Sequence, residues 1–519
     1  MYIQKISPQD IFDRINADAY APHFVEAMHR LESSQLNLST LGNVVCRPIN
    51  NSIRGVTGEL NNTGSIIPMF RPADISGGEA NISSAPKLSA DFESDHVKSR
   101  VYPGDLVLGI AGSVGVVGRV PKNIDFGNIN GSSARISTGE DYRSAYLLSY
   151  LQSKYGQSAM LRFGVGSVQK HLNLEDLPKV VVLCPAELAQ KYIGEKVRQA
   201  ERLRAWAKSI KQTLQEFEND IPVKKHPRTN KKYAISRTFD LTENRLDAEF
   251  YEDKHIDLNR QFNCEFSSLG ALTTGFKYGS SVKAEYVEKG KGIPFVRGNA
   301  LTDNEISSSD IVYLDRSLTD ELKNNFLNIG DVMITRSGTV GVACDVYEGF
   351  DKYAYGSFII NSKPKSEVIN PLYLSWYLNS WVGQQQFRRW ENGAVQLNIN
   401  TEELASIEIW IAPNEFQLKV AEQIKLLRAV NRLAQCLIAS AKLLVEDLIE
   451  GQLTESQLVS AQQALEAGDD SLDRALLERM TAEGVDGEGE PLFDDIDQLY
   501  DLLEQAKQAL DADDTMVEA

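Results

Sequence analysis

Gly104-Asp105-Leu106-Val107-Leu108 is the most informative stretch of this chain, because it returns as Gly330-Asp331-Val332-Met333-Ile334. The agreement continues beyond it, through Ala111-Gly112-Ser113-Val114-Gly115 in the first copy and Ser337-Gly338-Thr339-Val340-Gly341 in the second. The offset between the copies is 226 residues throughout. An aliphatic run that ends in a glycine-containing turn predicts two β-strands joined by that turn. The sequence therefore contains the same predicted strand pair twice.

Further matches lie in the same order along both halves of the chain, at similar offsets. They are Arg14–Tyr20 with Arg245–Tyr251, Ser39–Gly42 with Ser267–Gly270, Ile67-Pro68 with Ile293-Pro294, Tyr146–Leu151 with Tyr373–Leu378, and Gly166–Asn173 with Gly393–Asn400. A repeat of this length indicates duplicated domains rather than a solenoid of short units.

Each copy closes with an aliphatic strand, a proline and a long helical segment. The strands are expected at Lys179–Leu183 and Ile407–Ile411, and the prolines are Pro185 and Pro413. In the helices that follow, apolar residues recur at steps of three and four, which is typical of a coiled-coil seam. The first seam is Ile193, Val197, Ala200, Leu203, Ala207, Ile210, Leu214 and Phe217, and the second is Val420, Ile424, Leu427, Ala434, Ile438, Ala441, Val445 and Leu448. Two helices that each pack on their own domain are the alternative interpretation.

These patterns predict an α+β protein with two tandem domains, each followed by a long helix, the two helices pairing as an antiparallel coiled coil. A small acidic helical appendage is expected at the C-terminus. The predicted boundaries are 1–185 for the first domain, 186–220 for its helix, 221–236 for a linker, 237–412 for the second domain, 413–450 for its helix and 451–519 for the extension.

The net charge of −18 is concentrated at the C-terminal end of the chain. Residues 451–519 contain 19 acidic and 3 basic residues, which leaves residues 1–450 with a net charge of only −2. A nearly neutral body can still carry a basic face, so the total charge neither supports nor excludes a nucleic-acid partner.

Motifs for catalysis and metal binding are missing from the sequence. There is no Gly-x4-Gly-Lys-(Ser/Thr) nucleotide loop. None of the five cysteines lies within four residues of another, so no CxxC-type half of a zinc site is present, and their odd number and wide scatter are typical of reduced cysteines. Asn370-Pro371-Leu372-Tyr373 has some likeness to the Asn-Pro-Pro-Tyr loop of amino-methyltransferases, but it lacks the second proline, and the start of a helix explains it better. The sequence has neither a signal peptide nor a run of apolar residues long enough to span a membrane, so we expect no membrane association and a cytoplasmic location.

The repeated motifs carry a family resemblance. The Gly-Asp strand followed by Thr335–Gly341, and the Gly393–Ile399 loop that leads to Ile407–Pro413 and a helix containing Gln423-Ile424, resemble recurring blocks of the specificity subunits of type I restriction–modification systems. The resemblance covers about residues 10–450 and includes both halves. The acidic extension lies outside the common pattern.

This resemblance implies a non-catalytic subunit with two target-recognition domains, each reading one half of a split site in double-stranded DNA. The paired helices would separate the two domains and dock two methyltransferase subunits, to which restriction and translocase subunits add. No cofactor is implied for this chain, because S-adenosylmethionine, ATP and Mg would belong to the partner subunits.

Candidate DNA-binding side chains lie in the matched loops. Arg336 is the first choice, because arginine can bond guanine through two atoms, and Gln169 and Gln396 could read adenine. A structural role in bracing the loop is the alternative for both glutamines. The remaining candidates are Ser337, Asn398, Lys170, His171, Arg71, Arg297, Lys277 and Lys283, for which a solvated surface side chain is the alternative. On the helices that would bind partners, the candidates are Ile193, Val197, Leu203, Ile210, Leu214, Ile424, Leu427, Ile438 and Val445.

Two other functions remain open at the level of sequence. One is a stand-alone DNA methyltransferase or nuclease with an unrecognised site. The other is an interaction scaffold whose acidic extension imitates DNA.

Overall fold

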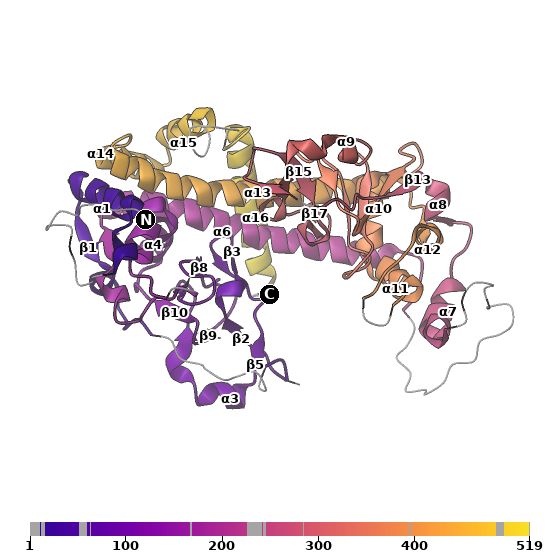
Figure 1. Ribbon diagram of the computed structural model, residues 1–519, viewed down its shortest axis with the longest axis horizontal. Helices are drawn as coiled ribbons and strands as arrows, with labels where there is room; N and C mark the ends of the chain where they lie inside the picture. Colours follow the sequence, from indigo (N-terminus) through magenta and orange to yellow (C-terminus); the bar gives the residue numbers. More distant parts are fainter. Residues whose placement is uncertain are drawn as a thin grey trace. The chain divides into compact units, whose positions relative to one another are not determined.

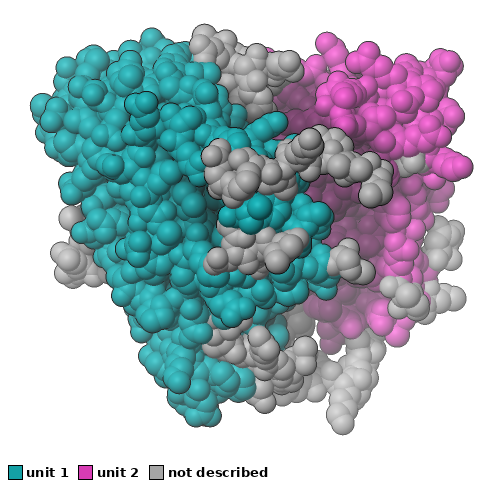
Figure 2. Space-filling view, turned by 60° about the vertical axis from the view of Figure 1, so that its left-hand side comes forward, with its two compact units in different colours: residues 1–206, 430–519 teal, residues 207–429 magenta. Residues whose placement is uncertain are grey.

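A computed structural model describes residues 16–50, 60–62, 64–166, 169–225, 247–283, 285–393, 396–483 and 492–517, together with Ile11, Leu241 and Arg245. The chain divides into two compact units, residues 1–206 with 430–519 (unit 1) and residues 207–429 (unit 2), which Figure 2 colours separately. Parts of the predicted features lie outside the described residues: Arg14, Ile15, Ser167, Val168, Leu246, Ala394, Val395 and residues 226–236 of the linker.

Unit 1 contains two β-sheets and a separate strand pair among its described residues (Figure 1). The larger sheet has the order β10 (Ser133–Ile136), β7 (Leu106–Gly109), β8 (Val117–Arg119), β4 (Glu79–Ala80) and β3 (Ile75–Ser76). The smaller sheet has the order β5 (Lys87–Leu88), β2 (Ile67–Phe70), β9 (Gly127–Ile129) and β6 (Arg100–Val101). The pair joins β1 (Leu38–Thr40) to β11 (Val181–Leu183).

Unit 2 repeats this plan with small differences. One sheet has the order β13 (Thr273–Tyr278), β22 (Ile359–Pro364), β19 (Val332–Thr335) and β20 (Ala343–Asp345). Another has the order β14 (Tyr286–Val287), β18 (Val312–Leu314), β15 (Ile293–Val296) and β21 (Ala354–Tyr355). Two strand pairs complete it, β12 (Phe266–Ser268) with β23 (Glu408–Trp410) and β16 (Leu301–Thr302) with β17 (Glu305–Ile306).

The strand pairing reproduces the sequence repeat residue by residue. Leu106 lies opposite Arg119 between β7 and β8, and Val332 lies opposite Asp345 between β19 and β20. Both members of each pair are related by the 226-residue offset. The other sheet of each unit agrees as well, because β2 runs parallel to β9 and β15 runs parallel to β21. The predicted strand, turn and strand are therefore confirmed in both copies.

Most of the remaining short helices of the two repeats also occur as matched pairs, and the repeat in unit 2 has one more of them than the repeat in unit 1 among the described residues. Unit 1 has α1 (Pro22–Ser33), α2 (Leu41–Val44), α3 (Ala90–Ser94), α4 (Asp141–Gln152) and α5 (Lys154–Leu161). Unit 2 has α7 (Asp253–Asn259), α8 (Leu269–Leu272), α9 (Thr319–Leu322), α10 (Pro371–Asn379), α11 (Trp381–Trp390) and α12 (Thr401–Ala405).

The same buried tyrosine anchors α4 and α10. The Tyr146 hydroxyl on α4 donates to the Leu183 carbonyl at 2.8 Å, and the Tyr373 hydroxyl on α10 donates to the Trp410 carbonyl at the same distance. Each bond ties a helix to the strand that closes its repeat, while satisfying a phenol group that would be costly to bury alone.

Two long helices follow the closing strands, and they pack against each other. They are α6 (Glu187–Glu216), continued by a 3₁₀ turn at Phe217–Asp220, and α13 (Asn414–Glu450). In unit 2 the ring of Phe217 lies 5.7 Å from that of Phe416, and the Lys419 ammonium lies 4.9 Å from the Phe217 ring. Each predicted seam residue is buried except Ile438, which is half-buried. A partner subunit would therefore contact other residues of these helices.

Each long helix is joined to its own domain by a buried ion pair, and the polarity of the pair reverses between the units. In unit 1 Arg119 of β8, only 1% exposed, donates to Glu201 of α6 at 2.6 Å. In unit 2 Arg428 of α13 donates to Asp345 of β20, also at 2.6 Å. Arg119 and Asp345 occupy equivalent repeat positions, as do Glu201 and Arg428. The domain carries the cation in one unit and the anion in the other.

The acidic extension forms α14 (Glu455–Glu466), α15 (Ser471–Glu483) and α16 (Ile496–Val517), and it packs on α6 within unit 1. Asp473 of α15 accepts bonds from Lys196 at 2.6 Å, from Tyr192 at 2.6 Å and from Tyr500 at 2.6 Å. The side chains of Asp473 and Lys196 are both 0% exposed. Burial acts to raise the pKa of Asp473, but Lys196 and the two hydroxyls outweigh it, so this pKa lies below its ordinary value.

Among the described residues, none of the helices combines the length and the apolar character that crossing a bilayer requires.

Candidate nucleic-acid interface

The turn after β19 and the loop after α11 pair with each other in unit 2. The Gly338 amide donates to the Leu397 carbonyl at 3.1 Å, and the Ile399 amide donates to the Arg336 carbonyl at 3.0 Å. The structure therefore brings together four of the candidate positions, namely Arg336, Ser337, Gln396 and Asn398. They form one loop cluster on the rigid end of a sheet, which is a common location for binding residues.

The Arg336 guanidinium is held in a fixed position. Its Nε and Nη2 atoms donate to Oδ1 of Asn398 at 3.2 and 3.0 Å, and its centre lies 4.7 Å from the centroid of the Tyr278 ring. A guanidinium has five N–H groups, so three remain for another acceptor. Asn398 thus serves here as the residue that orients Arg336.

Unit 1 has the same loop pairing with different side chains. The Leu172 amide donates to the Ile110 carbonyl at 2.9 Å, and the amide of His171 donates to the Val165 carbonyl at 2.8 Å. Ile110 and His171 stand where unit 2 has Arg336 and Asn398. Lys170 and His171 are both exposed. The two units share the backbone pairing of these loops but differ in the side chains that the loops carry.

Glycine is required at one position of each loop. A Cβ added to Gly166 would lie 2.3 Å from the carbonyl oxygen of Gln169, and a Cβ added to Gly393 would lie 2.3 Å from that of Gln396. Both glycines have positive φ, +104° and +107°. Gln169 and Gln396 thus occupy equivalent, exposed sites at the loop tips. The glycine of each loop fixes the position of the glutamine backbone, and the exposed glutamine side chains are available to contact a ligand.

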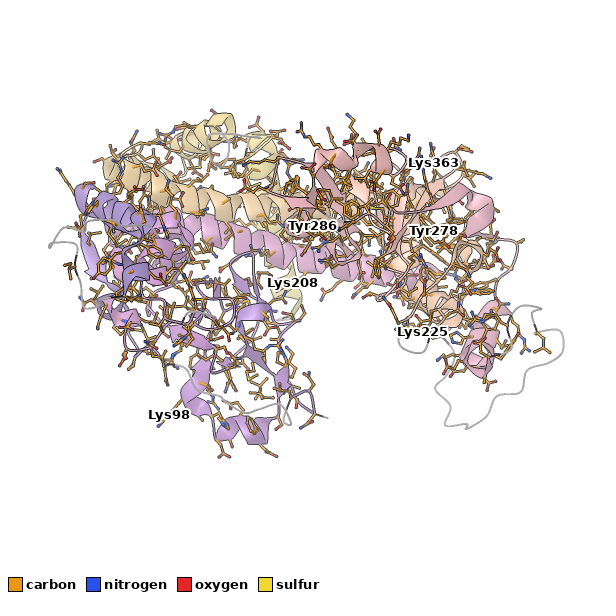
Figure 3. All side chains as sticks on the ribbon, in the orientation of Figure 1. Lys98, Lys208, Lys225, Tyr278, Tyr286 and Lys363 are labelled. Carbon is orange, nitrogen blue, oxygen red and sulfur yellow. The ribbon has the colours of Figure 1, made fainter. Side chains whose placement is uncertain are left out.

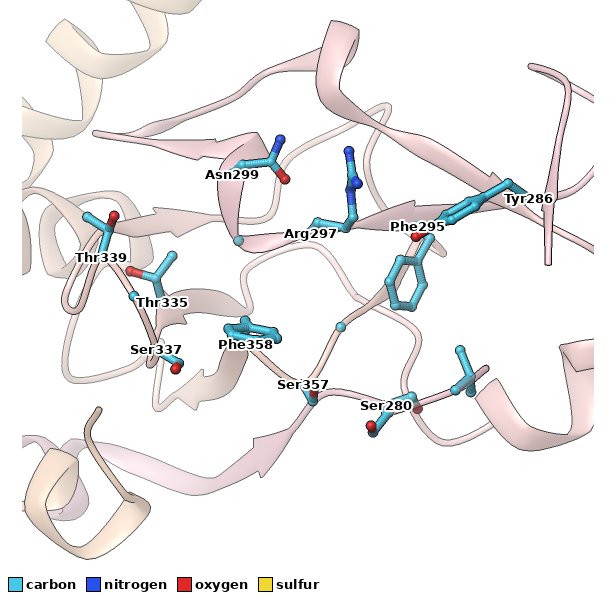
Figure 4. Close-up of a pocket in the computed structure, with 15 residues that line it drawn as sticks. Ser280, Tyr286, Phe295, Arg297, Asn299, Thr335, Ser337, Thr339, Ser357 and Phe358 are labelled. Atoms are coloured by element: carbon cyan, nitrogen blue, oxygen red, sulfur yellow. The ribbon is translucent and has the colours of Figure 1, made fainter. Parts of the chain in front are cut away.

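A cavity of about 560 Å³ lies beside the turn after β19 in unit 2 (Figure 4). Arg297, which follows β15, lines this cavity together with Ser337 and Phe358. The equivalent residue of unit 1, Arg71, donates from Nε and Nη2 to the two carboxylate oxygens of Asp74 at 2.9 Å each.

The two candidate lysines of unit 2 lie on the edge of this region. Lys277 is exposed on β13, and its ammonium group donates to the Asn324 carbonyl. Lys283 is exposed in the segment between β13 and β14.

Sequence reasoning missed the exposed aromatic residues of this surface. Tyr278 is 40% exposed, Tyr286 is 60% exposed and Phe358 is 49% exposed, and the first two are labelled in Figure 3. Tyr286 and Phe358 line the cavity, whereas Tyr278 supports Arg336. The available signal was an aromatic residue in a glycine- and serine-rich stretch, as in Lys277-Tyr278-Gly279.

The motif with some likeness to a methyltransferase loop begins a helix, as its proline predicted. Oδ1 of Asn370 accepts from the Leu372 amide at 2.9 Å and caps α10. Tyr373 is fully buried against β23. In the part of the chain that the structure describes, no group of three or more histidine, cysteine or acidic side chains is arranged to hold a metal ion.

Asp105 and Asp331 each form a turn at the start of a strand. Oδ2 of Asp105 accepts from the Tyr102 amide at 2.9 Å, and Oδ2 of Asp331 accepts from the Asn328 amide at 3.1 Å. A turn-forming role, expected for an aspartate after glycine, accounts for both carboxylates.

Comparison with known proteins finds a relative among curated proteins and similar solved structures. No family model matches the chain. The specificity subunit of the type I restriction enzyme EcoBI from Escherichia coli is 31% identical over 151 residues, which is 28% of this chain and 31% of that relative. The match therefore spans about a third of the relative's length.

The similar structures include a type I restriction–modification S subunit from M. genitalium and an HsdS subunit from Thermoanaerobacter tengcongensis. The first has a TM-score of 0.39 and 13% identity, and covers 81% of this chain and 97% of its own. The second has a TM-score of 0.26 and 15% identity, and covers 80% and 97%. The sequence match shows that 151 residues of this chain are similar to part of a type I restriction enzyme specificity subunit.

Proposed function

We propose that this chain is the DNA sequence-recognition subunit of a type I-like restriction–modification complex. The observation that carries the proposal is a duplicated backbone with unlike side chains at its matched loops. Ile110 and His171 in one unit correspond to Arg336 and Asn398 in the other. Two frameworks of one design that present different donors and acceptors suit the reading of two different half-sites.

The two target-recognition domains are assigned to residues 1–185 and 237–412, joined through the linker at 221–236. The helices at 186–220 and 413–450 form an antiparallel coiled coil that keeps the two reading domains apart. The contact of Phe217 with Phe416 supports this direction, because it joins the end of the first helix to the start of the second. A helix of 30 residues, the length of α6, is about 45 Å long, which exceeds one turn of B-DNA.

Direct base contacts are assigned first to Arg336, whose remaining N–H groups match the acceptors of guanine. Gln169 and Gln396 contact bases or phosphates from the equivalent loop tips. Ser337, Lys170, His171, Lys277 and Lys283 add contacts to the DNA backbone, which position the protein on the duplex.

In this proposal the partner subunits carry out methyl transfer and restriction. Two methyltransferase subunits dock on the outward faces of the helix pair, and restriction subunits join them. S-adenosylmethionine, ATP and Mg bind in those subunits, and this chain contributes none of the reacting groups.

An assay of methyl transfer separates this proposal from a stand-alone enzyme. The pure chain, incubated with double-stranded DNA and labelled S-adenosylmethionine, should transfer no label, whereas addition of its methyltransferase partner should start transfer to specific sites. Label transferred by the pure chain, at a rate that scales with its concentration, would assign catalysis to this chain and overturn the proposal.

A further inference from the structure

Arg71 and Arg297 occupy the same position in the two copies, directly after β2 and β15. In unit 1 both edge nitrogens of Arg71 are bonded to Asp74, whose side chain is 2% exposed. The ion pair raises the pKa of Arg71, chiefly through the side-chain bond to Asp74. The donors of Arg71 that face Asp74 are therefore satisfied within the protein.

Unit 2 has no carboxylate at the position equivalent to Asp74. The residue equivalent to Asp74 is Ala300, which ends the matching 3₁₀ turn at Gly298–Ala300. The Nε atom of Arg297 is buried, and no described residue accepts a hydrogen bond from it. A buried donor without an acceptor costs about 1–3 kcal/mol, so such a group in a folded protein requires an explanation.

The surroundings of Arg297 explain why its Nε atom has no acceptor among the described residues of the protein. Its side chain borders the 560 Å³ cavity, whose wall also includes Ser337 of the turn after β19 and the half-exposed Phe358. In Figure 4 the side chains of Arg297 and Asn299 extend in the same direction from the segment that follows β15. An arginine fork is thus held at the wall of an open cavity, beside the turn that carries Arg336.

We infer that Arg297 is a specificity-determining residue of unit 2 and that this cavity receives the major-groove edge of a guanine, an inference that rests on the function proposed above. Guanine O6 and N7 are the pair of acceptors that an arginine fork matches best. The base takes the place that Asp74 fills in unit 1. Arg71, by contrast, is a structural residue that closes its own turn and reads no base.

The test exchanges the carboxylate between the units. Wild type, Arg297→Ala and Ala300→Asp are each expressed with the methyltransferase partner, and the methylated motif is determined by sequencing the host genome. Arg297→Ala should lower the preference for one guanine in one half-site by about tenfold, and leave the other half-site unchanged. Ala300→Asp should have the same effect, because the new carboxylate bonds Arg297 as Asp74 bonds Arg71.

Matched controls keep the result interpretable. Ala300→Ser adds a polar atom without a charge and should keep the wild-type motif. Arg71→Ala should also keep the motif, although it removes the bond to the buried Asp74 and should lower the melting temperature. Melting curves of the purified chains identify a variant that fails to fold, and the Arg297→Ala and Ala300→Asp results then support the inference only if both chains remain folded and the guanine preference is lost.

Two results would overturn the inference. An unchanged motif for Arg297→Ala would show that this arginine reads nothing. A uniform loss of methylation with no change in the motif would assign it to a phosphate. If the wild-type chain specified no motif at all, the proposed function itself would fail, so the two failures are distinguishable.

Discussion

His255 is a buried titratable side chain of unit 2. It is 4% exposed on α7, and its Nδ1 accepts a bond from Nε2 of Gln385 at 3.1 Å. Burial, followed by the nearby charge of Lys254, lowers the pKa of this imidazole to about 4. The folded protein thus keeps His255 neutral under conditions that protonate a free histidine.

A pH-dependent loss of stability follows from this depressed pKa. Between about pH 6.5 and 4 the unfolded chain binds a proton that the folded chain does not, so stability falls as the pH falls through that window, by about 3 kcal/mol in all, and levels off below it. His255→Leu should remove this contribution. The difference in melting temperature between His255→Leu and wild type, measured from pH 7.5 to 4, should therefore shift in favour of the variant as the pH falls. A difference that is constant over this range would contradict the assignment.

At this scale the sequence allowed only part of the site to be predicted. Arg336 could be singled out because arginine can bond guanine through two atoms, but its orientation by Asn398 and Tyr278 depends on contacts between residues distant in sequence. The difference between Arg71 and Arg297 could have been read from Asp74 and Ala300, had the repeat been aligned position by position. Burial of the Arg297 nitrogen depends on packing, which no local pattern encodes.

The ion pairs have opposite polarity in the two units. We therefore predict that reversing the pair of unit 2 restores the stability that is lost when one partner is removed. Asp345→Ala leaves Arg428 with an unpaired charge beside the core of unit 2, and should destabilise the chain by about 3 kcal/mol. The double variant Asp345→Arg with Arg428→Glu should recover most of this loss, because unit 1 already has that polarity at the same positions, in Arg119 and Glu201. Melting temperatures of the single and double variants measure the coupling.

A double variant no more stable than either single variant would contradict that prediction.

The opposite polarity of the two ion pairs also has a consequence for the exchange of domains between the helices. A first domain transplanted onto the second helix would bring Arg119 against Arg428, two like charges. We therefore expect exchanged domains to fold well only with their own helices.

Docking of the acidic extension on α6 depends on its buried aspartate. Asp473→Asn would leave the ammonium of Lys196 buried without a charged partner, which should loosen α14–α16 and expose them to protease. Asp497→Asn, at a side chain that is 87% exposed, is the matched control and should leave cleavage unchanged. Limited proteolysis followed by mass spectrometry reads out the release of residues 455–517. Equal cleavage of both variants and wild type would mean that Asp473 does not hold the extension.

Element types were easier to predict than their ends. The long helices begin within a residue or two of the predicted positions, because a proline precedes each and the apolar period is sustained. The strand expected at Lys179–Leu183 begins only at Val181, since Leu177–Lys179 forms a 3₁₀ turn. The shortest strands, such as β5 and β14, have two residues each, too few for any alternation to be visible.

At the scale of the whole molecule, the helix pair is proposed to fix the spacing between half-sites. Insertion of one heptad into both helices, at matched points, keeps the seam in register and adds about 10 Å at 1.5 Å per residue. The unspecified gap in the methylated motif should lengthen by about three base pairs, while both half-sites stay unchanged. A gap of unchanged length would show that these helices do not set the spacing.

A shorter insertion is the control for this prediction. Two residues inserted into one helix would rotate its seam by about 200°, since each residue turns about 100°. That variant should lose methylation altogether rather than alter the gap.

The total charge illustrates what composition could not predict. A net charge of −18 argues against DNA binding if it is spread evenly, but most of it lies in the extension. Part of that acidity is used inside unit 1, where Asp473 of the extension pairs with Lys196 of α6. The basic candidate residues for DNA binding all lie outside the extension in the sequence.

The methylome of a host with and without this gene tests the central claim most directly. If the chain is the recognition subunit, one motif made of two separated half-sites should be methylated when the gene is present. The same motif should lose its methylation when the gene is deleted, although the methyltransferase gene remains intact. Methylation that persists at every motif after deletion would contradict the claim that this chain reads DNA for its partners.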